Sequence, residues 1–296
     1  MFRGTYTSIQ SHFYMINDDH RTNSFIKAIQ QKVNKNSTVI DLGSGTGILG
    51  LECAKAGAKQ VHLVEQESKL ASIIQEAVQH KNLKQTCIVH NKRSDDFFKS
   101  FNESADLIVC EGIGDHIFES RMIYDFLLYK EKLNITHSIP ESFKLCIHSH
   151  TVKINRQRLG EHQELIDKLD IPVLDSIYMV EDKISDPLYV YGDKVTDQTC
   201  ILEFSSINDL NKEIKVELSR IPSKDEYLIL YFDILLGKDI FLSNHPSRPD
   251  QNHSYYQRLI SCKNITSAHI KINIDYTQHV IGVEDKPYPN IEVHDV

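Results

Sequence analysis

Two glutamates close to the end of an apolar run are the residues of this sequence that most suggest chemistry. Residues 106–119 read DLIVCEGIGDHIFE, in which the apolar run stops at Glu111 and Glu119 follows eight positions later. An acid at the end of a strand often lies in an active site, because ligands of α/β folds bind beyond the carboxyl ends of the strands. The spacing raises the question of what these two carboxylates hold.

A glycine-rich turn lies at an earlier strand end. The sequence VIDLGSGTGILG places Gly43, Gly45 and Gly47 between a strand and a helix, where glycine permits a tight turn and the close approach of a ligand. A dinucleotide fingerprint would need a glycine at position 48, which is Ile48 here. The GxGxG spacing is typical of S-adenosylmethionine (SAM) sites, and Glu65 at the next strand end could accept hydrogen bonds from both ribose hydroxyls. We expect a SAM site, with a nicotinamide site or a purely structural glycine turn as alternatives.

Alternating strand and helix patterns in the first half of the chain would position these motifs. The patterns predict strands at 38–42, 61–65, 86–90 and 106–110, and helices at 48–56, from residue 68, and from about 119 to 133. Gly57 is expected to cap the first helix and Ser68 is a plausible N-cap of the second. This βαβα order favours a parallel sheet covered by helices on both faces.

The pattern of apolar and polar residues changes after Pro140. The following segments alternate apolar and polar residues and are separated by turn residues, which predicts an antiparallel sheet or barrel. They read FKLCIHSHTVKI, TCILEF, EIKVEL, YLILYFDILL, AHIKINI and HVIGVE, with one helix-like insert at 161–180. We therefore expect a SAM-binding domain over residues 1–140 and a β-barrel-like domain over 141–296, with the active site in the cleft between them.

Composition limits the functions that the chain can have. The 296 residues, with 41% hydrophobic and 25% charged residues, are typical of globular domains. A formal net charge of −8 does not favour a nucleic-acid partner, and no apolar stretch is long enough to span a membrane. The first residues contain no apolar region of a secretory signal, and the six cysteines form no CxxC pair. We expect a cytoplasmic protein with reduced thiols.

Four stretches of the chain resemble the protein arginine methyltransferase family, and more closely its divergent, type III-like branch. They are HFYMINDDHR (12–21), the glycine loop through the ribose acid (41–65), NKRSDDF (91–97) and CEGIGDHIFESRM (110–122). The resemblance continues more loosely through NHPSRPDQNHSYY (244–256). It implies a Rossmann-like, SAM-dependent methyltransferase domain followed by an antiparallel β-barrel-like domain.

The resemblance also implies a role for each matching residue on the cofactor side. Arg21 would pair with the carboxylate of SAM, Glu65 would bind the ribose, and Arg93 and Ser94 would lie near the adenine. The complete cofactor-binding set that we expect is Arg21, Asp41, Gly43, Ser44, Gly45, Gly47, Glu65, Arg93, Ser94 and Glu111.

On the acceptor side, the resemblance implies that Glu111 and Glu119 grip the guanidinium of an arginine in a protein or peptide. A guanidinium is planar and always charged, and two carboxylates can orient it through bidentate hydrogen bonds. Asp18 would meet His253, and either this pair or Glu119 would take the proton. Met15 and Met122 would flank the acceptor, although core packing is the alternative interpretation of both methionines.

Two departures from the family pattern leave other acceptors open. The two glutamates are usually nine positions apart in the family but eight apart here, and the usual Thr-His-Trp reads Asn252-His253-Ser254. The alternatives are a methyltransferase of a small guanidino or amino compound or of a natural-product peptide, and a SAM-binding scaffold without turnover. Family members work as dimers through an arm, so the resemblance implies a homodimer, with 161–180 as the candidate arm.

Overall fold

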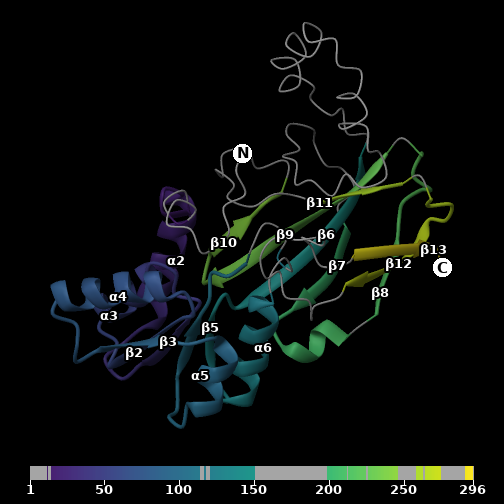
Figure 1. The fold of residues 1–296 in the computed structure, drawn as a ribbon. Helices are drawn as coiled ribbons and strands as arrows, with labels where there is room; N and C mark the ends of the chain where they lie inside the picture. The colour runs from purple at the N-terminus through teal and green to yellow at the C-terminus, as the bar shows by residue number, and fades with distance from the viewer. Residues whose placement is uncertain are drawn as a thin grey trace, which may run out of the picture.

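The chain folds as a parallel, helix-covered sheet joined to antiparallel strands (Figure 1). The computed structural model describes His12, residues 15–113, Ile117, and residues 121–150, 199–211, 213–224, 226–245, 258–262, 264–274 and 291–295.

The first sheet has five parallel strands in the order β3-β2-β1-β4-β5. The strands are β1 (Thr38–Leu42), β2 (Gln60–Glu65), β3 (Cys87–Asn91), β4 (Leu107–Val109) and β5 (His137–Ile139). Three of them are buried along nearly their whole length, as expected of parallel strands covered on both faces. The predicted strands at 38–42, 61–65, 86–90 and 106–110 are confirmed to within two residues at each end.

Helices cover both faces of this sheet (Figure 1). Right-handed crossovers put α3 (Ile48–Lys55) and α4 (Ser68–His80) on one face and α5 (Ser94–Ser100) and α6 (Met122–Lys132) on the other. A further helix, α2 (Asp19–Lys32), precedes β1 and packs beside α3.

The strand order reverses between β1 and β4, which are neighbours in the sheet. In open α/β sheets, the crevice beyond the carboxyl ends of two such strands is the usual ligand site. The glycine loop follows β1, and Glu111 follows β4 by two positions. Both motifs that the sequence singled out therefore lie at the same switch point.

Antiparallel strands begin at β6, after the last parallel strand. One sheet has the order β10-β9-β6-β7, with β11 also paired to β9, and a second has the order β13-β12-β8. The strands are β6 (Ser142–His150), β7 (Thr199–Phe204), β8 (Ile214–Glu217), β9 (Tyr227–Gly237), β10 (Ile240–Ser243), β11 (Arg258–Ser261), β12 (His269–Ile274) and β13 (Ile291–Asp295), with a short 3₁₀ helix, η1 (Ile207–Asn211). These strands confirm the predicted antiparallel, β-barrel-like second half.

The two halves share a continuous hydrophobic core. Phe143 of β6 contacts Phe126 of α6 edge-on, with ring centroids 6.3 Å apart, and stacks on Phe204 of β7 at 4.9 Å. On the other side, Gln31 of α2 donates to the carbonyl of Lys238 at 3.2 Å and accepts from its amide at 3.0 Å. Helix α2 is thus fixed against the turn between β9 and β10.

Two local expectations differ from the structure. Ser68 is the first residue of α4 rather than its N-cap, which is Glu67, and its hydroxyl donates to Asn91 Oδ1 at 3.0 Å. The short strands β5, β10, β11 and β13 have no counterpart among the predicted strands. The helix-like insert at 161–180 and the segment HVIGVE (279–284) lie outside the described residues.

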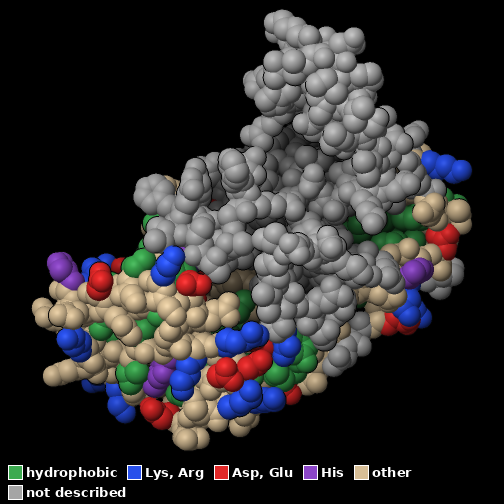
Figure 2. Space-filling model, viewed as in Figure 1, with side chains coloured by type: hydrophobic (Ala, Val, Ile, Leu, Met, Phe, Trp, Pro, Cys, Tyr) green, Lys and Arg blue, Asp and Glu red, His purple; other side chains and the backbone are tan. Residues whose placement is uncertain are grey.

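The surface and the thiols agree with the composition. On the face shown in Figure 2, the described side chains of both charge signs are interspersed. All six cysteines are free, and all but Cys200 are buried, which confirms the expected core thiols for five of them. Of the helices that the structure describes, none has the length and hydropathy required to cross a membrane.

Candidate active site

The glycine loop has a backbone that only glycine adopts without strain. Gly43, Gly45 and Gly47 have φ angles of +71°, +56° and +82°. A Cβ atom at Gly43 would lie 2.6 Å from Met122 Cε, and one at Gly45 would lie 2.8 Å from the ring of His12. The loop is therefore closely covered by side chains from two segments distant in the sequence.

Glu65 at the end of β2 is tied to this loop. Its carboxylate accepts a hydrogen bond from Gly45 N at 2.8 Å and another from Glu67 N at 2.8 Å. The residue is only 7% exposed, and burial raises the pKa of its carboxyl. A carboxylate has about four acceptor positions, so these two bonds leave capacity for further donors.

Asp41 at the end of β1 holds the start of α3. Its Oδ2 accepts from Gly50 N at 2.9 Å, and Ser44 Oγ donates to the Asp41 backbone carbonyl at 2.9 Å. Burial raises the pKa of Asp41 to about 7. Asp41 and Ser44, both predicted to be cofactor residues, thus fix the position of the glycine loop through hydrogen bonds at its two ends.

Arg21 and Glu111 form an ion pair at the switch point. Arg21 Nη1 lies 3.1 Å from Glu111 Oε1, and Arg21 Nη2 donates to the carbonyl of Met15. The Asp18 side chain caps α2 by accepting from Arg21 N at 2.9 Å. The sequence assigned Arg21 to the cofactor and Glu111 to both the acceptor and the cofactor, and it did not predict their direct contact.

Met122 lies under the glycine loop. A Cβ atom at Gly43 would meet its Cε, and a Cβ atom at Gly112 would lie 2.7 Å from its Cβ. Its side chain therefore packs between the loops that follow β1 and β4. Of the two predicted acceptor-flanking methionines, Met122 lies beside the glycine loop, and Met15 contributes its backbone carbonyl to Arg21.

The segment after β3 is held from α6. Arg93 is the N-cap of α5, and Ser94 Oγ donates to Asp125 Oδ2 at 2.8 Å. Asp125 also accepts from Arg121 Nε at 3.1 Å. Sequence reasoning missed Asp125, because nothing in the pattern of α6 shows which buried position faces another helix.

Two predicted catalytic residues, Glu119 and His253, lie outside the described residues. The structure therefore does not place the second glutamate or the Asp18–His253 pair, and both remain predictions. Among the described residues, no group of three or more His, Cys, Asp or Glu side chains could hold a metal ion.

Comparison with known proteins confirms the resemblance to protein arginine methyltransferases. The family model described as "Conserved hypothetical protein 95" matches residues 17–111. The chain is 35% identical over 130 residues to "Probable protein arginine N-methyltransferase 6.1" of Oryza sativa subsp. indica, covering 43% of this chain and 34% of the relative. It is 27% identical over 236 residues to "Protein arginine N-methyltransferase 2" of Dictyostelium discoideum, covering 75% of this chain and 46% of the relative. The chain thus spans less than half the length of these curated relatives.

Solved structures confirm the fold over nearly the whole chain. The Arabidopsis thaliana Protein Arginine Methyltransferase 10 has a TM-score of 0.68 at 18% identity, over 98% of this chain and 94% of that one. The Trypanosoma brucei PRMT1 enzyme-prozyme complex with AdoHcy has a TM-score of 0.65 at 21% identity, over 92% and 89%. These likenesses establish a Rossmann-like domain followed by a β-barrel-like domain.

Proposed function

We propose that this chain is a SAM-dependent N-methyltransferase that methylates the guanidinium of arginine in a protein or peptide. One observation carries the proposal: Glu111, whose carboxylate binds the guanidinium of Arg21, lies at the same switch point as the glycine loop. Such an arrangement suits a reaction between a bound cofactor and a bound guanidinium.

The cofactor side of the proposal rests on the shape of the loop after β1. Gly43 and Gly45 hold the loop in a left-handed backbone without a Cβ atom, and Glu65 has acceptor capacity at the end of β2. Arg21, Glu65, Arg93 and Ser94 would hold SAM, which supplies an electrophilic methyl group. Two solved relatives are named with AdoHcy or SAH, the product form of this cofactor.

The acceptor side rests on the chemistry of Glu111. A charged guanidinium is a poor nucleophile, and a carboxylate that holds it concentrates positive charge on the nitrogens that it binds. The remaining nitrogen is then free to face the methyl group. Correct positioning of two reactants can contribute several kcal/mol to lowering a barrier.

The nitrogen that accepts the methyl group must also lose a proton. Glu119 or an Asp18–His253 pair would take it, and Asp18 stands at the start of the helix that carries Arg21. The Glu111–Arg21 ion pair then links the acceptor carboxylate to the cofactor residue Arg21, so that both reactants would be oriented by one rigid unit.

A second candidate function has a specific observation in its favour. The chain is 30% identical over 102 residues to "Arginine N(omega)-methyltransferase" of Streptomyces achromogenes subsp. streptozoticus, covering 34% of this chain and 28% of that relative. Together with the shorter spacing between Glu111 and Glu119, this similarity favours a small guanidino compound as the alternative acceptor. A SAM-binding scaffold without turnover is the non-enzymatic alternative.

We further propose that the protein acts in the cytoplasm as a homodimer. The support is the resemblance to dimeric enzymes and the similarity to the Trypanosoma brucei relative, which is named as an enzyme-prozyme heterotetrameric complex. Light scattering at micromolar concentration tests the assembly: a mass near twice 34.1 kDa is expected, and a monomer contradicts it.

The experiment that tests the activity is transfer of a tritiated methyl group from SAM to three acceptors in parallel. These are an arginine-rich peptide, a cell lysate and free arginine. Acid hydrolysis and amino-acid chromatography then identify the labelled product. Methylarginine from peptide or lysate protein supports the main proposal, label in free arginine alone supports the second, and no transfer despite SAM binding supports a scaffold.

A further inference from the structure

A buried carboxylate joins two segments that border the candidate site. Asp125 of α6 is 2% exposed, and each of its oxygens accepts a hydrogen bond. Ser94 Oγ donates to Oδ2 at 2.8 Å, and Arg121 Nε donates to Oδ1 at 3.1 Å. One donor comes from a different helix, 31 positions earlier in the chain, and the other lies four positions earlier, at the start of α6 itself.

Each of the two donors lies next to a different part of the candidate site. Ser94 is the first residue of α5 and follows the carboxyl end of β3, on the predicted adenine side of the cofactor site. Arg121 is the N-cap of α6 and follows Glu119 by two positions. A shift of Asp125 would therefore move both the adenine side and the end of the segment that carries the two glutamates.

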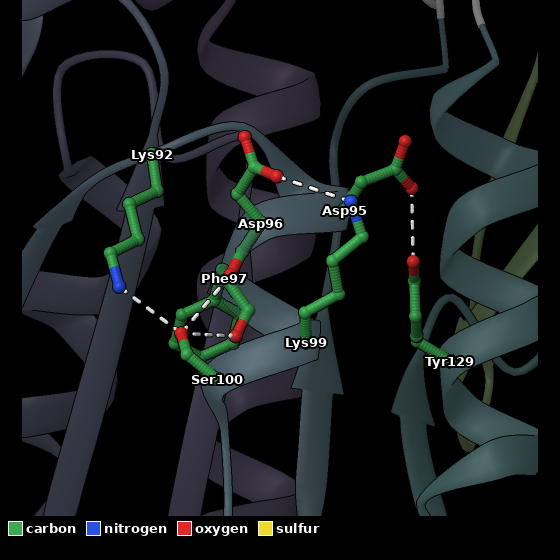
Figure 3. A network of polar contacts seen from close by, with 7 residues as sticks. All are labelled: Lys92, Asp95, Asp96, Phe97, Lys99, Ser100 and Tyr129. Atoms are coloured by element: carbon green, nitrogen blue, oxygen red, sulfur yellow. Dashed lines mark hydrogen bonds and ion pairs between the residues drawn. The ribbon is translucent and has the colours of Figure 1, made fainter.

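Packing of the two helices alone does not require this carboxylate. Tyr129 of α6 donates to Asp95 of α5 at 2.9 Å, and its ring stacks on Phe98 with centroids 3.6 Å apart. Figure 3 shows the Asp95–Tyr129 bond beside the bonds of Ser100 and the Asp96–Lys99 pair within α5. The two contacts of Tyr129 already join α5 to α6, near the C-terminal end of α6.

A buried carboxylate is a costly way to join helices, because its desolvation must be offset by well-aligned donors. Burial raises the pKa of Asp125, while the Ser94 hydroxyl and the Arg121 guanidinium act against this rise. The gain from such a contact is geometric: it fixes both donors in one position relative to each other.

We infer that Asp125 is a positioning residue that holds Ser94 and Arg121 together and so couples the adenine side of the cofactor site to the acceptor-binding segment. This inference rests on the proposed function. An amide at this position keeps one acceptor oxygen and replaces the other with an NH₂ group, which cannot accept the hydrogen bond that this oxygen now receives. Because Ser94 and Arg121 lie in different segments, the loss of a fixed geometry between them would weaken the binding of both SAM and the acceptor.

The test compares Asp125→Asn with Tyr129→Phe, a matched control that removes the other polar bond between the same two helices. Binding of S-adenosylhomocysteine is measured by calorimetry, thermal stability by circular dichroism, and the KM values for SAM and for the arginine acceptor by methyl transfer. For Asp125→Asn we expect about tenfold weaker binding and a several-fold rise in both KM values. Tyr129→Phe should lower stability and leave binding unchanged.

Ser94→Ala provides a second variant that removes only one donor and keeps the buried charge paired with Arg121. Its effect on binding should not add to that of Asp125→Asn if the coupling runs through this bond. The inference would be overturned if Asp125→Asn lost as much stability as Tyr129→Phe but kept its affinity for S-adenosylhomocysteine and both KM values within twofold of wild type. An effect on only one of the two KM values would also overturn it. A wild-type chain that does not bind S-adenosylhomocysteine would overturn the proposed function itself.

Discussion

The guanidinium of Arg21 lies 3.1 Å from the carboxylate of Glu111, although 90 positions separate the two residues. Arg21 is 6% exposed, and a buried charge of this kind needs a partner. The ion pair fastens the start of α2 to the end of β4. It thereby brings the segment that precedes the parallel sheet to the switch point where the glycine loop begins.

Replacing Arg21 with lysine tests the role of this guanidinium. Lysine keeps the charge but lacks the planar fork that can bind Glu111, the Met15 carbonyl and a cofactor carboxylate together. We expect Arg21→Lys to weaken S-adenosylhomocysteine binding by about tenfold, or about 1.4 kcal/mol, in calorimetry. Arg220→Lys is the control, because Arg220 pairs with Glu226 at 2.5 Å in the antiparallel half. Equal affinities for Arg21→Lys and wild type would refute the assignment of Arg21 to the cofactor.

The glycine loop can be tested with two alanine variants that share a left-handed backbone. Gly45 has φ of +56° and a Cβ there would lie 2.8 Å from His12, whereas Gly57 has φ of +96° and nothing within 4 Å. Both substitutions should lower the free energy of unfolding, by roughly 1–3 kcal/mol from backbone strain. Only Gly45→Ala should also abolish S-adenosylhomocysteine binding. A loss of binding in both variants, or in neither, would contradict a cofactor role for this loop.

Asp41 predicts a specific pH dependence of stability. Burial raises its pKa to about 7 in the folded state, above the ordinary value of 3.8, so the folded protein binds the extra proton between these values. Its contribution to stability is therefore present below about pH 4 and is lost as pH rises through about 7. In urea titrations, Asp41→Asn should be more stable than wild type at pH 8. This difference in stability should be smaller at pH 5. The control is Asp106→Asn, which changes an exposed acid that accepts from Thr38 N at 2.8 Å at the other end of β1. A stability difference that does not change with pH would contradict the buried-acid interpretation.

A stacked pair of histidines, buried His62 and half-buried His90, predicts a dependence of the opposite sign. His62 Nδ1 lies 3.0 Å from His90 Nε2. Phe97 and Phe101 pack against His62, and a carboxylate oxygen of Glu103 lies 3.7 Å from His62 Nε2. Burial lowers the pKa of both rings, that of His90 to about 4. The positive charge of Lys92 also lowers the pKa of His90. The unfolded chain therefore binds more protons between about pH 6.5 and 4, and stability falls as pH falls through this range.

The variant His90→Gln isolates this effect from that of Asp41. Wild type should lose more stability than His90→Gln between pH 7 and pH 5, as measured by urea unfolding of both proteins in the same buffers. His137→Gln, at an exposed position of β5, should behave like wild type. Parallel stability curves for wild type and His90→Gln would show that the pair does not take up protons on unfolding.

The sequence was sufficient to predict the elements that have long patterns. The apolar runs of β1 and β2 and the helical spacing of α4 each depend on neighbouring residues, so their burial could be expected. Strand β5 has only three residues, His137–Ile139, and is a strand because it pairs with β4. Ser68 is a good N-cap residue in isolation, but in the fold its hydroxyl bonds Asn91 from the neighbouring strand end.

The site was predictable in its motifs and not in its contacts. The spacing of the glycines and the position of Glu65 indicated the loop, and the structure brings Gly45 N to Glu65 at 2.8 Å. The Arg21–Glu111 and Ser94–Asp125 contacts join residues that are 90 and 31 positions apart, and no local pattern specifies them. Such pairings follow from the strand order, which only the folded sheet determines.

The variant Glu111→Gln tests whether Glu111 binds the acceptor while the glycine loop binds the cofactor. Glutamine keeps an acceptor oxygen for Arg21 but removes the negative charge that holds a guanidinium. Calorimetry with S-adenosylhomocysteine and tritiated methyl transfer to an arginine peptide would be measured on the same preparations. Glu52→Gln, which changes the carboxylate paired with Lys55 at 3.3 Å on α3, is the control.

We expect Glu111→Gln to bind S-adenosylhomocysteine within about threefold of wild type and to lose methyl transfer by about 100-fold or more, equivalent to about 2.7 kcal/mol of the barrier. The control should retain both properties. Methyl transfer at the wild-type rate by Glu111→Gln, or a parallel loss of cofactor binding, would contradict the claim that Glu111 holds the acceptor.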